Sequence, residues 1–379
     1  CIRDSAERID CGGRTVIPGL IDTHWHATLC GISQIAAMTQ DIGFVHLIAG
    51  QQAGATLMRG FTTIRDVGGP AFGLQAAVDR GVVTGPRIFP SGAILSQTSG
   101  HGDFRFSNAL PMMPSDPADY ATRQGMTALA DGVPEVLRRT REQLMKGASQ
   151  IKISAGGGVA SQYDPLESLQ FTLDEMRAAV DAAADWGTYV CAHVYTAPGI
   201  RRCIEAGVKS IEHGQLADED TVRMMADRGT WWSIQPFLQD EDANTYTDPK
   251  AVAAQKAVAE GTVQAFEWAE KHKVNWAFGT DILYGGGESQ GRQLAKLARF
   301  MSPLAALHRA TGAAGALLAL SGGRAPYDGR LGVIAEDALA DLLVIDGDTE
   351  ASLDWLADTA NLRLIMKNGR LFKNELQGG

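Results

Sequence analysis

The sequence predicts an α/β fold: a TIM-like (β/α)8 barrel followed by a small separate β unit. Strand-like apolar runs recur eight times along the 379 residues, and helix-period stretches separate them. A hydrophobic content of 45% is enough for a barrel of about 250 residues and a second unit. The expected strands are residues 16–23, 62–67, 87–90, 150–154, 188–193, 208–213, 230–235 and 274–280.

Each expected strand is a short apolar run, from VIPGLIDT at the first to VNWAFGT at the last. Helices are expected between them at residues 173–186, which carry Asp174 and Glu175 in the first turn, and at 197–206 and 249–271. Right-handed crossovers make closure of eight such units natural. Beyond Arg324 the pattern changes to two strands joined by a Lys-Asn-Gly turn in LRLIMKNGRLF, which predicts a β-hairpin in a separate small sheet.

Two histidines end the first expected strand, in VIPGLIDTHWHA. Residues i and i+2 of a strand face the same side, so His24 and His26 can reach one ion while Trp25 points away. The same spacing also fits two histidines on a polar strand face. A metal site is favoured because an apolar strand ending in an acid precedes the pair and small residues follow it.

Lys152 lies between Ile151 and Ile153 in QIKISAGGG, so it faces opposite to its apolar neighbours. In a closed barrel that direction is the interior, where an unpaired ammonium is costly and a lysine tends to lose its proton. A neutral amine can react with carbon dioxide to give a carbamate with one oxygen for each of two metals. The alternative is a wall lysine whose ammonium reaches the rim.

Three further candidates stand at later strand ends: His193 in VCAHVY, His213 in SIEHG and Asp281 in FGTD. A buried, hydrogen-bonded histidine is the alternative for either imidazole. A helix N-cap or a loop acid is the alternative for Asp281. Since a parallel barrel gathers its catalytic groups at the C-terminal ends of its strands, all three are expected beside His24 and His26.

Together these segments resemble the amidohydrolase superfamily. SGHGD at residues 99–103 and GGGVASQYDPLESLQFT from residue 156 are similar to its Xaa-Pro dipeptidase, metal-dependent carboxypeptidase and ochratoxinase-like branch. The resemblance covers nearly the whole chain. It implies two divalent ions, with zinc expected because imidazole suits it. It also implies the ligand set, in which carbamylated Lys152 bridges an ion held by His24, His26 and Asp281 and an ion held by His193 and His213.

The resemblance also implies how the chain is divided. A barrel would span residues 16–323, and residues 1–15 and 324–379 would build the β-sandwich. Family members usually contribute several strands before the barrel, so the N-terminal part is expected to be incomplete and a signal peptide would be invisible. The compartment stays open, either cytoplasmic or exported, and a homo-oligomer is expected.

The expected reaction is hydrolysis of an amide or peptide bond that releases a C-terminal amino acid, as in dipeptidases, carboxypeptidases and the conversion of ochratoxin A to phenylalanine and ochratoxin alpha. Asp281 would move the proton to the leaving nitrogen. His101 and Tyr195 look like family positions that contact the substrate carboxylate or carbonyl, although a loop histidine and a rim tyrosine are the alternatives. An imidazolonepropionase-like cyclic amide hydrolase or deaminase, and a non-catalytic scaffold, are the competing functions.

Composition excludes several partners. The net charge of −10 argues against nucleic acid, because phosphate binding requires basic patches. No membrane partner is expected, since no apolar run is read as long enough to cross a bilayer. Five cysteines, an odd number without CxxC spacing, indicate neither a disulfide framework nor a zinc ribbon.

Overall fold

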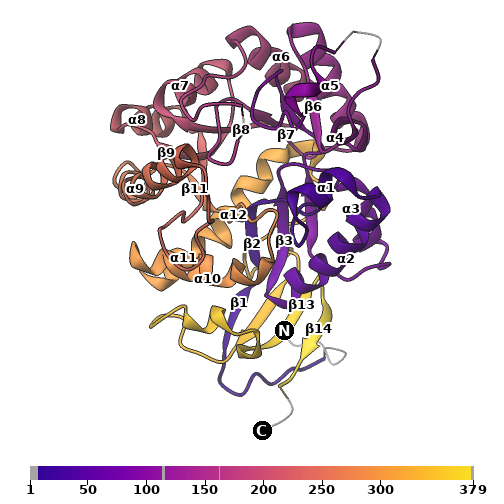
Figure 1. Cartoon of the computed structure of the whole chain (residues 1–379). Coiled ribbons are helices and arrows are strands. Elements are labelled where there is room, and N and C mark those ends of the chain that lie inside the picture. The colour runs from indigo at the N-terminus through magenta and orange to yellow at the C-terminus, as the bar shows by residue number, and fades with distance from the viewer. Residues whose placement is uncertain (1–6, 113–115, 162, 377–379) are drawn as a thin grey trace.

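The computed structural model describes residues 7–112, 116–161 and 163–376, and its parallel strands form two sheets (Figure 1). The smaller sheet contains β2 Leu20–Trp25, β3 Phe61–Asp66 and β4 Arg87–Pro90, in that order. The larger sheet contains β5 Ile94–Ser96, β6 Thr127–Leu129, β7 Ile151–Ser154, β8 Val190–Thr196, β9 Ser210–Leu216, β10 Trp231–Ile234 and β11 Trp276–Phe278. Its order is β11-β10-β9-β8-β7-β5-β6.

The two parallel sheets meet edge to edge without forming one closed ladder. The N–H of Asp281, just after β11, donates to the carbonyl of His24 at 2.8 Å, and the N–H of Ser149, just before β7, donates to Pro90 of β4 at 2.8 Å. The short strands β5 and β6 were not expected, and β5 takes the place beside β7 that β4 would occupy in a simple barrel. The α/β class is therefore confirmed, whereas the arrangement is consistent with a TIM-like barrel but is not continuously closed.

Helices cover the outer faces of these sheets (Figure 1). The predicted helices are found as α6 Leu173–Ala184, α7 Ala197–Ala206 and α9 Pro249–Lys271, and α6 begins with a capping box between Thr172 and Glu175. The other α-helices are α1 Gln34–Thr39, α2 Ile42–Met58, α3 Phe72–Asp79, α4 Tyr120–Gln124, α5 Val133–Lys146, α8 Glu219–Arg228, α10 Gln290–Ala295, α11 Pro303–Arg309 and α12 Gly312–Leu318. Short 3-10 helices are η1 Ser107–Ala109, η2 Gly287–Ser289, η3 Lys296–Arg299, η4 Ala319–Arg324, η5 Asp354–Ala357 and η6 Thr359–Asn361.

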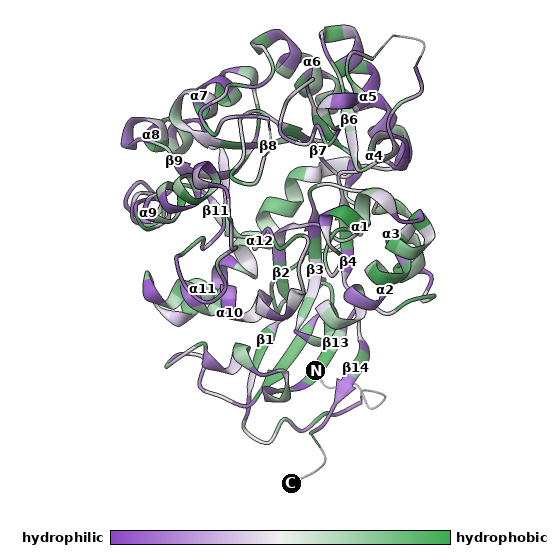
Figure 2. Cartoon of the chain, viewed as in Figure 1, coloured by the Kyte–Doolittle hydropathy of each residue, from purple (hydrophilic) through white to green (hydrophobic). Residues whose placement is uncertain are grey.

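The main core lies between the parallel strands and the surrounding helices, where the apolar colour concentrates in Figure 2. Ile151 and Ile153 of β7 pack in one cluster with Met176 and Ala179 of α6. Because strand side chains alternate, this outward packing leaves Lys152 on the opposite, interior side of the strand. The apolar face of each strand thus builds the core, and the polar face becomes available for chemistry.

A four-stranded antiparallel sheet joins the two ends of the chain. Its strands are β1 Thr15–Pro18, β12 Leu342–Ile345, β13 Leu362–Lys367 and β14 Arg370–Asn374, in that order. The predicted hairpin is confirmed, and Asn368 and Gly369 adopt the positive φ values of 51° and 73° that such a turn requires. The expected β-sandwich is not confirmed, because the described part of the N-terminal segment contributes β1 alone and builds one sheet. Residues 1–6 of that segment lie outside the described residues.

The strand expected over residues 16–23 is two strands, β1 and β2. The N–H of Gly19 donates to Asp341 beside the small sheet, whereas the N–H of Leu20 donates to Gly60 beside the parallel sheet. A Cβ on Gly19 would lie 2.1 Å from Thr62 Oγ1, so only glycine fits where the chain changes sheets. Periodicity could not show this change, because both strands are apolar.

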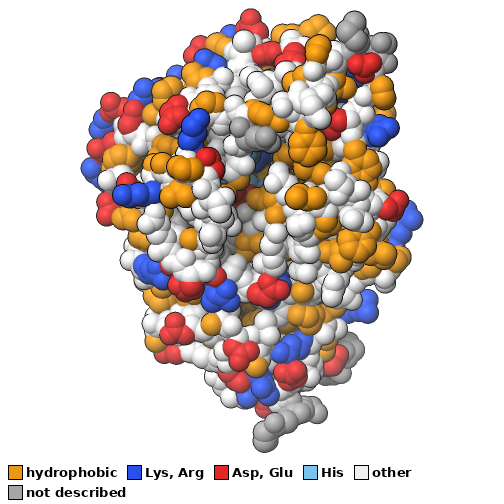
Figure 3. All heavy atoms as spheres, in the orientation of Figure 1, with side chains coloured by type: hydrophobic (Ala, Val, Ile, Leu, Met, Phe, Trp, Pro, Cys, Tyr) orange, Lys and Arg blue, Asp and Glu red, His pale blue; other side chains and the backbone are white. Residues whose placement is uncertain are grey.

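One segment, Pro303–Arg324, is long and apolar enough to cross a membrane by length and composition, with a mean hydropathy of 1.2. The expectation that the chain contains no such run was therefore wrong. The segment is divided into α11, α12 and η4, and half of its most apolar 18-residue stretch is buried. Ala314 and Leu317 pack against Ile21 and Phe89, as in a core helix. On the face shown in Figure 3, basic and acidic side chains are interspersed.

Candidate functional site

The six predicted ligands lie in, or just after, five of the parallel strands. His24 lies in β2 with His26 directly after it, and Asp281 follows β11. The remaining candidates are Lys152 in β7, His193 in β8 and His213 in β9. The His24 ring centroid lies 4.7 Å from that of His213, which lies 4.5 Å from that of His193. The structure therefore gathers the four imidazoles around one buried point.

The Asp281 side of this site, defined as His24, His26 and Asp281, is the most compact group. Asp281 Oδ1 lies 3.2 Å from His24 Nε2 and 3.2 Å from His26 Nε2. Two ligand atoms on one tetrahedral zinc, each at 2.0–2.1 Å, are separated by about 3.3 Å. The spacing of these donor atoms therefore fits a metal ion.

In both His24 and His26 the ring nitrogen Nδ1 forms a hydrogen bond, so Nε2 is the nitrogen that faces the centre of the site. His24 Nδ1 lies 2.7 Å from Glu212 Oε2, and His26 Nδ1 lies 3.0 Å from the carbonyl of Gly68. Both partners only accept hydrogen bonds, so each Nδ1 donates and each Nε2 of a neutral ring carries a lone pair. His24 Nε2 is buried and has no hydrogen-bond partner among the described residues. Lone pairs thus converge with Asp281 Oδ1 where a cation would satisfy them.

On the His193 side, defined as His193 and His213, one ring nitrogen of each histidine again forms a hydrogen bond and the other nitrogen is left free. His193 Nε2 donates to the carbonyl of Gly157 at 3.1 Å, which leaves the lone pair of Nδ1 free to bind a metal ion. His213 Nδ1 lies 2.9 Å from Gln235 Oε1, and the Gln235 amide nitrogen donates to Ser233, so Nε2 is free. Burial lowers the pKa of both histidines well below the ordinary value, which keeps the neutral form that binds metal.

Lys152 is only 2% exposed, on the interior side of β7. Among the described residues none forms a hydrogen bond or ion pair with its Nζ, although the charges of Glu212 and Asp281 act on it. Burial lowers its pKa, and this effect outweighs the attraction of the two carboxylates. A lysine held in this way favours the neutral amine that carbamylation requires. The rim-reaching alternative does not fit its burial.

The backbone is strained at two of the candidate ligands. His213 has a φ of 75° and Asp281 a φ of 55°, in the left-handed region that L-residues rarely adopt. Such a conformation costs about 1–3 kcal/mol and persists where the surroundings determine it. The strained residue lies within β9 in the case of His213 and just after β11 in the case of Asp281.

Sequence reasoning missed the buried pair of Arg65 and Glu212 beneath the site. Both are fully buried, and Arg65 Nη2 contacts the two Glu212 carboxylate oxygens at 2.8 and 2.7 Å. The pKa of Glu212 lies far below its ordinary value because Arg65 and His24 overcome the opposing effect of burial. A signal was present, since both charges stand inside strand-like runs, in TTIRDV and SIEHG.

The predicted substrate contacts line the same site. The ring of His101 stacks on His193 with centroids 3.9 Å apart, and its Nδ1 lies 2.5 Å from Ser161 Oγ. Its side chain is 29% exposed, so a ligand can reach it. Tyr195 stacks on His213 at 4.9 Å. Gly158 packs so closely on His101 that a Cβ would lie 2.3 Å from the ring.

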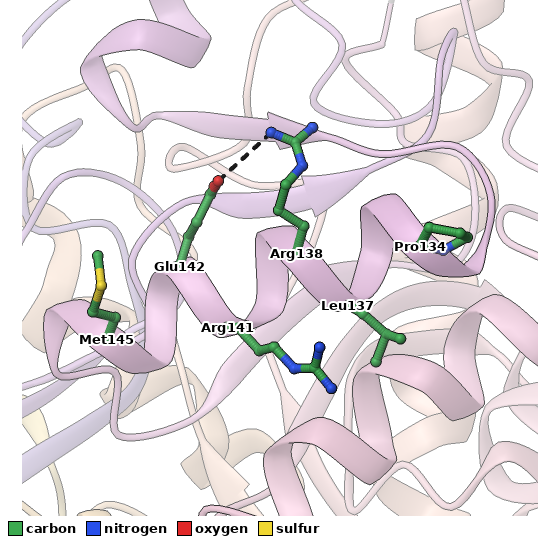
Figure 4. A pocket seen from close by; sticks show the side chains of 6 residues that line it. All are labelled: Pro134, Leu137, Arg138, Arg141, Glu142 and Met145. Carbon is green, nitrogen blue, oxygen red and sulfur yellow. Dashed lines mark ion pairs between the residues drawn. The ribbon is translucent and has the colours of Figure 1, made fainter.

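A separate surface groove of about 550 Å³ follows the outer side of α5 (Figure 4). Its lining comes from that helix alone: Pro134, Leu137, Arg138, Arg141, Glu142 and Met145. Figure 4 shows Arg138 reaching Glu142, an ion pair of 3.7 Å. The groove contains none of the predicted site residues, so volume does not identify the reactive site here.

The chain is similar to known proteins in both sequence and structure. The chain is 33% identical over 326 residues to ochratoxinase from Aspergillus niger, covering 84% of this chain and 66% of that protein's length, slightly under two thirds. The crystal structure of an amidohydrolase, 37% identical, matches with a TM-score of 0.89 and covers 100% of this chain and 91% of its own. A prolidase complexed with N-methylphosphonate-L-proline, 36% identical, matches with a TM-score of 0.88, covering 99% and 90%.

The amidohydrolase family matches residues 15–372, which is nearly the whole chain. The match spans both the parallel sheets and the small terminal sheet, and it includes every candidate ligand. The chain therefore belongs to the amidohydrolase family.

Proposed function

We propose that the chain is a binuclear metal-dependent hydrolase that cleaves an amide or peptide bond and releases a C-terminal amino acid. The convergence of His24 Nε2, His26 Nε2 and Asp281 Oδ1 carries this proposal. Family membership and the similarity to an ochratoxinase and a prolidase support the choice of bond. In this proposal residues 16–323 form the catalytic unit, residues 1–15 and 324–379 form the small terminal domain, and the protein assembles as a homo-oligomer.

The donor set fits two divalent ions. The Asp281 side offers two imidazoles and a carboxylate, and the His193 side offers two imidazoles, a combination that suits zinc. Lys152 would join this donor set as its carbamate, which would offer two anionic oxygens. Bound ions supply an electrophile for the substrate carbonyl and lower the pKa of water toward neutrality.

Asp281 moves the proton during the reaction. Its pKa lies well below the ordinary value, because the neighbouring histidines outweigh the opposing effect of burial, and it is therefore ionised at neutral pH. Its side chain remains 16% exposed, so water and substrate can reach it. The carboxylate accepts a proton from the attacking water and delivers it to the leaving nitrogen, which must be protonated before the amide breaks.

His101 and Tyr195 bind the free carboxylate of the substrate. Their rings lie against the two histidines of the His193 side, and both can donate a hydrogen bond to an anionic oxygen. Phe237, whose ring stacks 6.0 Å from that of His213, provides an apolar wall nearby. This arrangement favours an acylated amino acid or a dipeptide with an apolar C-terminal residue.

An amino-acid-release assay with zinc-loaded protein tests the proposal. N-acylated phenylalanine, ochratoxin A included, and Xaa-Pro dipeptides should release the free amino acid. The His24→Ala variant, assayed at the same zinc concentration, should not. Hydrolysis of cyclic amides with no release from any acylated amino acid would move the assignment to the ring-opening members of the superfamily.

A further inference from the structure

The four candidate histidines differ in the hydrogen-bond partner of the ring nitrogen that faces away from the centre of the site. His26 and His193 donate to backbone carbonyls and His213 to an amide oxygen, all of which are neutral. His24 instead donates to the carboxylate of Glu212 at 2.7 Å. A negative charge behind an imidazole makes the ring a more basic ligand and holds its orientation.

Glu212 is held so that one of its oxygens faces His24. Arg65 contacts both carboxylate oxygens, and Ser210 Oγ donates to Oε1 at 2.6 Å. Arg65 also donates to the carbonyl of Thr23, the residue before His24, and to the hydroxyl of Tyr189 at 3.1 Å. The arginine therefore fixes both the carboxylate and the strand that carries the ligand.

We propose that Glu212, held by Arg65, is a positioning residue that makes the Asp281 side the tighter of the two metal sites. The Asp281 side combines the Asp281 carboxylate with an imidazole backed by a second carboxylate. The His193 side combines two imidazoles backed by neutral oxygens. This inference rests on the proposed function, because it concerns the same two ions.

The proposed difference in affinity between the two metal sites is tested by removing zinc with a chelator and measuring the remaining zinc over time by elemental analysis. The wild-type protein should lose one equivalent quickly and the other slowly. The Arg65→Met/Glu212→Gln double variant removes both buried charges together, since Glu212→Gln alone would leave an unpaired arginine in the interior. In the double variant the slow phase should become about 10- to 100-fold faster, while the fast phase stays unchanged.

Tyr189→Phe is the matched control, because it removes an acceptor from Arg65 without touching Glu212 or His24. Both phases should keep their wild-type rates in this variant. A double variant with a lowered melting temperature but an unchanged slow phase would make the pair merely structural and overturn the inference. Loss of both equivalents from the wild type in a single phase would overturn it as well.

A second measurement needs no folded double variant. In the metal-free wild type, nitrogen-15 NMR should show His24 protonated at Nδ1 and not at Nε2, with His24→Asn used to assign the signal. The opposite tautomer would overturn the role of Glu212. Failure of the wild type to bind zinc at all would overturn the proposed function together with this inference, whereas two bound ions with an unaffected slow phase would overturn the inference alone.

Discussion

The backbone N–H of Asp281 donates to the backbone carbonyl of His24 at 2.8 Å, so these two candidate ligands are linked through the main chain as well as through their side chains. Asp22 strengthens this link. It accepts hydrogen bonds from the N–H groups of His24 and Thr280 at 3.1 Å each, and from the hydroxyl of Thr280 at 2.7 Å. These hydrogen bonds hold β2 and the segment after β11 together beside the candidate metal ligands, at an edge where the two sheets do not form a continuous ladder.

Thr280→Val should destabilise the protein by about 1–3 kcal/mol, because the buried Asp22 carboxylate loses a donor. Thr140→Val is the matched control, since the buried Thr140 hydroxyl has no hydrogen-bond partner among the described residues. Urea unfolding of both metal-free variants measures the difference. Equal stability of the two variants would show that the bond to Asp22 contributes nothing.

Purified protein reconstituted with zinc should contain two ions per chain. Because the ions bind the folded state, each should add about 2.7 kcal/mol of stability at a free zinc concentration of 100 times its Kd. Elemental analysis and thermal unfolding with and without chelator check this. His26→Ala should lose zinc, while the exposed His308→Ala should keep both ions; one ion in a fully active wild type would contradict the binuclear centre.

Lys152→Ala should lose most activity, because the bridging anion disappears with the amine. Short carboxylic acids such as formate should restore part of the rate by occupying the place between the ions. Lys209→Ala, an exposed lysine just before β9, should behave like the wild type. Full rate and full metal content in Lys152→Ala would leave the lysine as a wall residue.

The stability of the metal-free protein should depend on pH because the buried Asp66 carboxyl has a raised pKa. Burial raises its pKa to about 7 despite the opposing effect of His26. Between its unfolded pKa of about 4 and pH 7 the folded state binds more protons than the unfolded state, so stability falls as pH rises, by up to about 1.4 kcal/mol per unit. Asp66→Asn should remove this slope in urea unfolding across pH 5–7; an unchanged slope would assign it to other groups.

Blocking the substrate carboxylate should reduce kcat/KM roughly 5- to 150-fold, because a buried donor left without its partner costs about 1–3 kcal/mol. The comparison is between N-acyl phenylalanine and its methyl ester or amide. Tyr195→Phe should slow the free acid and narrow the gap between free and blocked forms. Equal kcat/KM for both forms in the wild type would refute carboxylate recognition.

The sequence alone could predict the candidate site residues whose role follows from their immediate neighbours in the chain. The spacing of His24 and His26 and the isolation of Lys152 among isoleucines could be interpreted from strand alternation alone. The partner of His24 could not, because Glu212 lies 188 positions away and only the fold brings it within 2.7 Å. The strands β5 and β6 also escaped prediction, since runs of three residues are too short to show alternation.

On the Asp281 side, His24 and His26 lie far from Asp281 in the sequence, and this separation has a consequence during protein synthesis. Asp22 and Thr280, which fasten that side, are 258 positions apart. At about 5–20 residues per second, His24 and His26 are synthesised roughly 13–50 s before Asp281. An early zinc ion would meet two imidazoles without their carboxylate, so a complete binding site becomes available only after the last parallel strand has been made.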